Sequence, residues 1–195
     1  MVKIDREIRQ ALAGYTVGIA GLGGLGSNIA VSLARLGIAG LVLVDYDLVE
    51  ESNLNRQYYF RDQLGQKKTQ ALAENIGRID EGVRLRTLDM KLDKTNSYES
   101  FQDVDILVEA LDGPEDKSML VSEVLARSQI KIVAASGIAG FSSSNKIETR
   151  RVLDRLYICG DFEENGDLYL SPKVNIVAQH QANMVLRLIL GLEEV

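Results

Sequence analysis

A glycine-rich turn at residues 21–26, with the sequence GLGGLG, constrains the fold of this chain more than any other feature. It follows an apolar run at residues 15–20 and opens a segment, 24–36, whose apolar residues recur at helical spacing. The pattern predicts a strand, a tight turn and a helix N-terminus. Such a turn lets the backbone approach a phosphate, and the unpaired N–H groups of the helix favour an anion. We expect a nucleotide to bind at Gly21, Gly23, Gly24 and Gly26.

Strands and helices are expected to alternate along the chain. Apolar runs predict strands at residues 15–20, 40–45, 83–88, 104–109 and 130–135. Helical spacing predicts helices at residues 3–13, 24–36, 67–79, 114–127 and from 174 to Gly191. Extended runs at residues 146–152 and 156–159 are predicted to be antiparallel strands at one sheet edge. The fold class is therefore α/β: a Rossmann-like, doubly wound, mostly parallel sheet with a few antiparallel edge strands and helices on both faces.

In a sheet of this kind the ligand binds at the carboxyl ends of the strands. Residues that carry chemistry should therefore follow the strands that end at residues 20, 45, 109 and 135.

Composition narrows the class of protein. With 195 residues, the chain is expected to form one domain over residues 1–195. No apolar run is long enough to span a bilayer, and residues 1–10 lack a signal-peptide core, so we expect a cytoplasmic protein without membrane contact. The formal net charge of −6 argues against nucleic-acid binding. The single cysteine, Cys159, excludes an intrachain disulfide.

Two carboxylates follow the second predicted strand. Asp45 comes a little over twenty residues after the glycine turn, where an acidic side chain can accept a hydrogen bond from a ribose hydroxyl. Asp47 lies two residues further along. We expect Asp45 to recognise a ribose; the alternative is a surface carboxylate before a turn.

A block at residues 52–57, SNLNRQ, is rich in amides and contains one guanidinium, that of Arg56. Arginine presents a planar fork that binds phosphate oxygens, and Lys68 adds a point charge nearby. Together they would bind a triphosphate, which a dehydrogenase does not need. The alternative is that Arg56 is a solvated surface residue and Lys68 part of a charged first helical turn.

Asp112 follows the fourth predicted strand, where a carboxylate can hold Mg²⁺ through oxygen. Triphosphate chemistry usually requires this ion. The alternative, compatible with the first, is that Asp112 caps the helix that begins at Pro114. The one histidine, His180, falls in the predicted C-terminal helix and is interpreted as structural.

The sequence resembles the ThiF, MoeB and HesA family, which is related to ubiquitin-activating enzymes. The resemblance rests on residues 21–28, 44–47, 52–57, 65–68, Asp112, 135–137 and 140–141, in family order over most of the chain. Residues 159–161 and 178–183, together with the short length, are most similar to the compact ThiF branch.

The resemblance implies an ATP-dependent sulfur-carrier-protein adenylyltransferase of thiamine (thiazole) biosynthesis. Its substrate would be the C-terminal glycine carboxylate of a ThiS-like ubiquitin-fold carrier protein, with pyrophosphate as the leaving group. Because that carboxylate is already an anion, no general base is required. A homodimer is also implied. The implied contacts of Mg·ATP are Asp45 on the ribose, Asn53, Arg56, Gln57 and Lys68 around the phosphates, and Asp112 on the metal.

Some positions depart from the family pattern. The chain lacks the paired Cys-x-x-Cys motifs of larger members, so structural zinc is not expected. Cys159 is the only candidate for a cysteine that accepts the activated carrier, and the alternative is a buried, inert thiol. Residues 6–10 match an arginine motif that family members extend into the partner subunit's site, which would make Arg9 a catalytic group there.

Two other functions stay open on the residues alone. A nicotinamide-dependent oxidoreductase would use the glycine turn and Asp45, but it would have no use for Arg56, Lys68 and Asp112. A noncatalytic module would retain only the surface that binds the carrier. Carrier-dependent exchange of labelled pyrophosphate into ATP separates the three functions.

Overall fold

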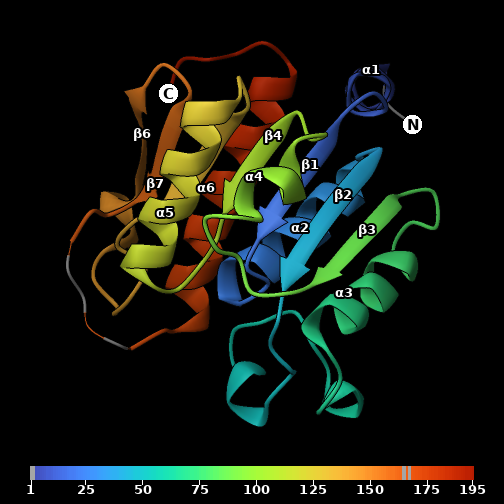
Figure 1. The fold of residues 1–195 in the computed structure, drawn as a ribbon, viewed down its shortest axis with the longest axis vertical. Coiled ribbons are helices and arrows are strands. Elements are labelled where there is room, and N and C mark those ends of the chain that lie inside the picture. Colours follow the sequence, from blue (N-terminus) through green and yellow to red (C-terminus); the bar gives the residue numbers. More distant parts are fainter. Residues whose placement is uncertain (1–2, 164–165, 167) are drawn as a thin grey trace.

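In the part of the chain that the structure describes, seven strands form one sheet in the order β3-β2-β1-β4-β5-β7-β6 (Figure 1). The computed structural model describes residues 3–163, 166 and 168–195. The strands are β1 (Thr16–Ala20), β2 (Gly40–Asp45), β3 (Arg84–Asp89), β4 (Ile106–Glu109), β5 (Lys131–Ala135), β6 (Glu148–Leu153) and β7 (Leu156–Gly160). The helices are α1 (Lys3–Leu12), α2 (Gly24–Leu36), α3 (Lys68–Gly77), α4 (Ser97–Phe101), α5 (Pro114–Arg127) and α6 (Ser171–Ile189). Three short 3-10 turns are η1 (Glu51–Asn53), η2 (Arg61–Gln63) and η3 (Ser144–Lys146).

The predicted fold class is confirmed. All strand pairs are parallel except β6 with β7. β7 pairs with β5 in parallel, so of the two predicted edge strands only β6 lies at the edge. The sequence pattern missed α4, a five-residue helix, because so short a helix has little room for apolar periodicity.

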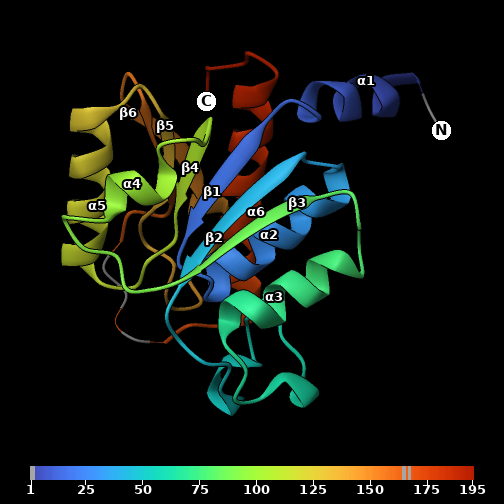
Figure 2. The ribbon, with the colours of Figure 1, turned by 45° about the vertical axis from the view of Figure 1, so that its right-hand side comes forward.

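Helices cover both faces of the sheet (Figures 1 and 2). On one face, α2, α3 and α6 pack on strand residues such as Ile19, Leu43 and Val108. On the other face, α4 and α5 pack on Val44 and Leu107 among others. Neighbouring residues of one strand thus enter opposite cores, which explains the nearly continuous apolar runs in the sequence.

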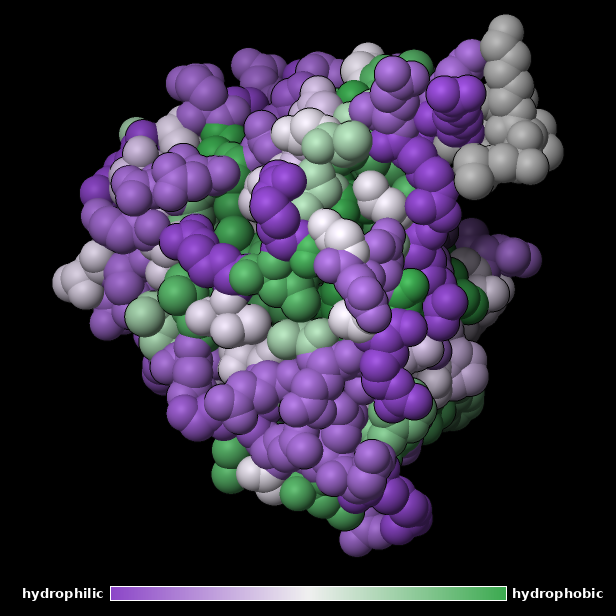
Figure 3. All heavy atoms as spheres, turned by 90° about the vertical axis from the view of Figure 1, so that its right-hand side faces the viewer, coloured by the Kyte–Doolittle hydropathy of each residue, from purple (hydrophilic) through white to green (hydrophobic). Residues whose placement is uncertain are grey.

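The free edge at β3 carries charged side chains. Arg84, Arg86 and Asp89 are exposed, and Figure 3 shows a mainly hydrophilic surface on this side with limited hydrophobic areas between. Charges on an edge strand oppose pairing with another chain. Among the described residues, no helix is long and apolar enough to cross a membrane.

The order in which strands are added to the sheet reverses beside β1. β2 and β3 lie on one side of β1, and the chain then crosses to β4 on the other side. Loops at the carboxyl ends of β1 and β4 diverge from this point, which leaves a crevice for a ligand. Gly21 has a φ of +88°, and a Cβ there would lie 2.5 Å from the Ala110 carbonyl oxygen. Only glycine allows the two strand ends to approach so closely.

We predict that Gly26→Ala destabilises the protein strongly. A Cβ at Gly26 would lie 1.9 Å from the Gly21 carbonyl oxygen, a backbone atom that cannot move without opening the turn. We expect the free energy of unfolding in urea to fall by at least about 2 kcal/mol. Gly77→Ala, in open space at the end of α3, is the matched control and should not destabilise. Equal unfolding midpoints for the two variants would contradict the packing described here.

Candidate functional site

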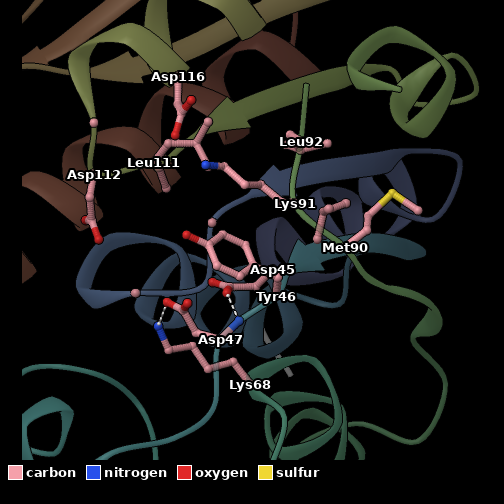
Figure 4. Close-up of a pocket in the computed structure, with 15 residues that line it drawn as sticks. Asp45, Tyr46, Asp47, Lys68, Met90, Lys91, Leu92, Leu111, Asp112 and Asp116 are labelled. Carbon is pink, nitrogen blue, oxygen red and sulfur yellow. Dashed lines mark hydrogen bonds and ion pairs between the residues drawn. The ribbon is translucent and has the colours of Figure 1, made fainter. Parts of the chain in front are cut away.

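A hollow of about 170 Å³ lies at the carboxyl ends of β1, β2, β3 and β4 (Figure 4). Its walls come from the glycine turn, from the three residues that begin with Asp45, from Lys68, and from the segments that follow β3 and β4. The segments that follow the strand ends predicted at residues 20, 45 and 109 therefore lie around the same hollow, as expected. The segment after β3, which supplies Met90, Lys91 and Leu92, was not predicted as part of the site.

The glycine turn presents unused N–H groups. Gly23 is the N-cap of α2 and has no side chain to cap the helix, so the first N–H groups of the helix are available to a phosphate. Tyr59 supports the turn by donating its hydroxyl to the Leu22 carbonyl at 2.8 Å. Burial, and then the nearby carboxylates of Asp45 and Asp47, raise the pKa of Tyr59, which keeps this phenol protonated as a donor.

Asp45 is buried and accepts hydrogen bonds that stabilise the glycine turn. Its Oδ2 accepts from the Leu22 N–H at 2.6 Å, and its Oδ1 accepts from the Asp47 N–H at 2.8 Å. Each carboxylate oxygen can accept a further hydrogen bond, so Asp45 retains the capacity to accept one from a ribose hydroxyl. The alternative of an exposed surface carboxylate is excluded, because only 9% of the residue is exposed.

Lys68 and Asp47 form an ion pair in the wall of the hollow, with Nζ 2.7 Å from Oδ2 (Figure 4). The Lys68 side chain is 6% exposed, so it is not a solvated residue of a charged helical turn. The predicted cation therefore lies in the wall of the hollow, and the Asp47 carboxylate partly compensates its charge.

The block at residues 52–57 is fastened to the start of α2. Ser27 accepts from the Tyr58 N–H at 3.0 Å, and Asn28 donates to the carbonyls of Gly24 and Arg56 at 2.7 and 3.0 Å. A Cβ on Gly24 would lie 3.4 Å from Arg56 Cγ. The Arg56 side chain thus lies beside Gly24 of the glycine turn, but it lines neither hollow of the site.

The predicted amides play different roles. Asn53 is buried, and its Oδ1 accepts from the Glu50 N–H, so it shapes the loop and does not line the hollow. Gln57 is also buried, and its Nε2 would lie 3.8 Å from a Cβ on Gly23. Its Oε1 has no hydrogen-bond partner in the described part of the chain. Neither amide lines a hollow, and of the two Gln57 is the one that lies beside the glycine turn.

A second hollow, of about 340 Å³, lies beside the first at the ends of β4 and β5. Its walls include Ser136, Gly137 and Ala139, at the fourth of the predicted strand ends. Leu111 and Asp112 line both hollows. The two spaces therefore meet at the predicted metal residue.

The Asp112 carboxylate is exposed and, within the described residues, accepts no hydrogen bond. Figure 4 shows Asp112 and Asp116 on one side of the first hollow, opposite Asp47 and Lys68. The N-cap of α5 is Gly113, so the capping role considered for Asp112 is wrong. The described residues contain no group of three or more side chains that could hold a metal by themselves. A free oxygen donor suits Mg²⁺, which usually completes its shell with phosphate oxygens and water.

Two buried ion pairs brace these loops and were not predicted. Glu109 is 1% exposed; its Oε1 and Oε2 accept from Lys117 at 3.1 and 3.2 Å, and Oε1 also accepts from the Leu111 N–H. Complete burial raises the pKa of Glu109, and the Lys117 ammonium opposes that rise. The sequence did contain a signal for the Glu109 ion pair: a glutamate within an apolar strand is expected to be buried, and a buried charge needs a partner of opposite charge. The second pair joins Lys173 and Asp161 at 2.5 Å.

Arg9 lies away from both hollows. It donates to the Arg35 carbonyl and approaches Gly37, at the end of α2 opposite the glycine turn. A helix of 13 residues is about 20 Å long, so Arg9 does not reach the site of its own chain. His180 lies on α6 with Nδ1 3.4 Å from the Thr149 hydroxyl, and it lines neither hollow.

Cys159 is fully buried at the end of β7, and burial raises the pKa of its thiol to about 11. A protonated, enclosed thiol is a poor nucleophile. We therefore predict that Cys159→Ala retains nucleotide binding and any pyrophosphate exchange within about two-fold of wild type, measured with equal amounts of folded protein. Loss of exchange in a variant with an unchanged unfolding midpoint would show that this interpretation of Cys159 is wrong.

Comparisons with known proteins agree with this architecture. A family profile described as "ThiF family" matches residues 1–195. The chain is 36% identical over 121 residues to adenylyltransferase and sulfurtransferase MOCS3 of Caenorhabditis briggsae, covering 62% of this chain and 30% of that protein. It is 29% identical over 185 residues to adenylyltransferase and sulfurtransferase UBA4 of Yarrowia lipolytica, covering 89% of this chain and 45% of that protein. The chain thus spans less than half the length of these curated relatives.

Solved structures share the fold. The ATP complex of E. coli tRNA N6-threonylcarbamoyladenosine dehydratase, TcdA, superposes with a TM-score of 0.88 at 20% identity, covering 95% of this chain and 89% of that one. E. coli MccB with ATP superposes with a TM-score of 0.78 at 21% identity, covering 96% of this chain and 59% of that one. At this level of identity the likeness concerns the fold alone.

Proposed function

The chain belongs to the ThiF family, and from that membership and the geometry of its site we propose that it is an ATP-dependent adenylyltransferase. Its proposed substrate is the C-terminal glycine carboxylate of a ThiS-like ubiquitin-fold sulfur carrier, used in making the thiazole of thiamine. Pyrophosphate is the other product. Curated relatives bear names such as adenylyltransferase and sulfurtransferase, and ubiquitin-like modifier-activating enzyme, which supports this class of activity.

One observation supports the proposal most strongly: Leu111 and Asp112 line both hollows. A two-substrate reaction needs two spaces that meet where the bond forms. The first hollow adjoins the glycine turn and Asp45, which suits a nucleoside and its first phosphate. The second has small residues, Gly137 and Ala139, in its wall and suits a narrow, extended glycine tail.

In this arrangement the ribose lies against Asp45, and the phosphates lie over the N-terminus of α2. Arg56 and Gln57 approach the turn from the side on which the β- and γ-phosphates would extend. Lys68 would exchange part of its contact with Asp47 for a phosphate oxygen. Asp112 would hold Mg²⁺, which neutralises charge on the phosphates when bound.

The proposed reaction requires the protein mainly to align the carrier carboxylate with the α-phosphorus of ATP. An α-carboxyl group has a pKa of about 3.5, so the carrier tail is a carboxylate at neutral pH and needs no base. One carboxylate oxygen attacks the α-phosphorus, and the bond from that phosphorus to the bridging oxygen of pyrophosphate breaks. Arg56 and the N–H groups of α2 stabilise the negative charge that develops on the leaving group.

Pyrophosphate exchange tests the proposal. With a ThiS-like carrier, Mg²⁺ and labelled pyrophosphate, label should enter ATP, because formation of the acyl-adenylate is reversible. The same carrier without its terminal glycine is the matched control and should give background exchange. If no ubiquitin-fold carrier supports exchange, the adenylyltransferase function is wrong. Oxidation of a reduced nicotinamide cofactor would instead favour an oxidoreductase.

We also propose a homodimer, because Arg9 is too far from the site of its own chain to act there. Only a second subunit could present this residue to a triphosphate. Sedimentation velocity should therefore show a dimer at micromolar concentration. A monomer that is fully active in exchange would exclude any role of Arg9 in the reaction.

A further inference from the structure

Tyr169 lines the second hollow and lies beside Arg56, the residue that the proposed function places at the phosphates; neither residue lines the first hollow. On one side its ring faces Arg56, whose Cζ lies 5.7 Å from the ring centroid. On the other side Tyr169 lines the second hollow, together with Gly137 and Ala139. The residue is half-buried and packs against the core between the sheet and α6. The Tyr169 ring thus lies beside Arg56 and also forms part of the wall of the second hollow.

Neighbouring groups orient the guanidinium of Arg56. Its Nη1 donates to the Ser52 carbonyl at 3.1 Å and to Asn55 Oδ1 at 2.8 Å, so one nitrogen is committed to the loop. A cation over an aromatic face is attracted by the ring quadrupole. The ring therefore restricts the rest of the guanidinium, whose long side chain otherwise has many rotamers.

The backbone around Tyr169 is tied to the second hollow. The Gly140 N–H donates to the Leu168 carbonyl at 2.7 Å, which joins the residue before Tyr169 to the loop after β5. Four residues after Tyr169, buried Lys173 donates to the Ala139 carbonyl and to Asp161, both at 2.5 Å. A ligand that contacts this loop therefore also restricts Tyr169.

We propose, on the basis of the proposed function, that Tyr169 is a positioning residue that couples the binding of the two substrates. A tail in the second hollow holds the ring over Arg56, and Arg56 is thereby held beside the glycine turn. The coupling acts equally in both directions, because the effect of each ligand on the affinity of the other is the same. ATP in turn orders the wall against which the tail binds.

Calorimetric titration measures this coupling without turnover. The probes are an ATP analogue with a methylene group between the α- and β-phosphorus, and a peptide that ends in Gly-Gly. For wild type, saturating peptide should lower the Kd of the analogue by about five-fold or more. Tyr169→Phe should keep this effect because the ring face remains. Tyr169→Ala should lose it, so that its Kd for the analogue is the same with and without saturating peptide.

Leu168→Ala is the matched control, because its side chain is adjacent in sequence, exposed, and outside the lining of the second hollow. It should keep the wild-type coupling. A Kd that does not respond to peptide in wild type, or coupling retained in Tyr169→Ala, would overturn the inference. Failure of wild type to bind the analogue at all would instead count against the proposed function. Circular dichroism confirms that each variant is folded.

Discussion

Asp112→Asn should lower the rate of carrier-dependent pyrophosphate exchange by roughly 10²–10³-fold, the loss seen when a group that stabilises developing charge is removed. The substitution keeps the shape of the side chain and removes the charged oxygen donor. Asp112 lies where the two hollows meet and, among the described residues, accepts no hydrogen bond, so its charge has no structural task. The unfolding free energy should therefore change by less than about 0.5 kcal/mol.

Glu115→Gln is the matched control for Asp112→Asn. Glu115 is exposed in the first turn of α5, three residues after Asp112, and lines neither hollow, so its substitution removes a charge of the same sign near the same helix end. Exchange should stay within about two-fold of wild type. Similar losses in the two variants would show that helix electrostatics, and not a specific contact of Asp112, explain the effect.

Arg56→Ala should also reduce exchange by roughly 10²–10³-fold, with a larger effect on kcat than on the KM for ATP. Arg56 lies beside Gly24 of the glycine turn and faces Tyr169, and in the proposed reaction it would stabilise the charge that develops on the departing pyrophosphate. An interaction that strengthens in the transition state lowers kcat when it is lost. Arg56→Lys should recover little, because an ammonium has neither the planar fork nor the same ring contact.

Arg61→Ala is the control in the same loop. The Arg61 side chain is 81% exposed and lies 3.3 Å from Glu51, an exposed pair that contributes at most about 1 kcal/mol to stability. Its exchange rate should equal that of wild type. If Arg56→Ala also retains wild-type exchange while folded, the triphosphate does not lie where we place it.

The turn and the parallel sheet were predictable because local sterics and short-range periodicity specify them. Gly21 needs a positive φ beside Ala110, and Gly26 has no room for a side chain, so glycines must occur at this spacing. Asp45 was placed at the site for the same reason, since it ends the strand beside the turn. The structure shows in addition that the Asp45 carboxylate shapes the turn, because it accepts a hydrogen bond from the Leu22 N–H.

Features that depend on contacts between distant residues were not predictable. Met90 and Leu92 carry no pattern of their own, and only the pairing of β3 with β2 brings them to the first hollow. The Lys173–Asp161 pair and the contact of Tyr169 with Arg56 likewise require the assembled fold. Exposed Arg9 matches a motif in sequence, yet α2 separates it from the site of its own chain.

If a carboxylate attacks the α-phosphorus of ATP, one carboxylate oxygen passes to AMP, and measuring this transfer tests the proposed reaction directly. A ThiS-like carrier with ¹⁸O in its terminal carboxylate is incubated with the protein, Mg²⁺ and ATP, and hydroxylamine then captures the activated carbonyl. We predict AMP that contains one ¹⁸O atom and a carrier that ends in a hydroxamate. Labelled inorganic phosphate with ADP, or AMP without label, would contradict it.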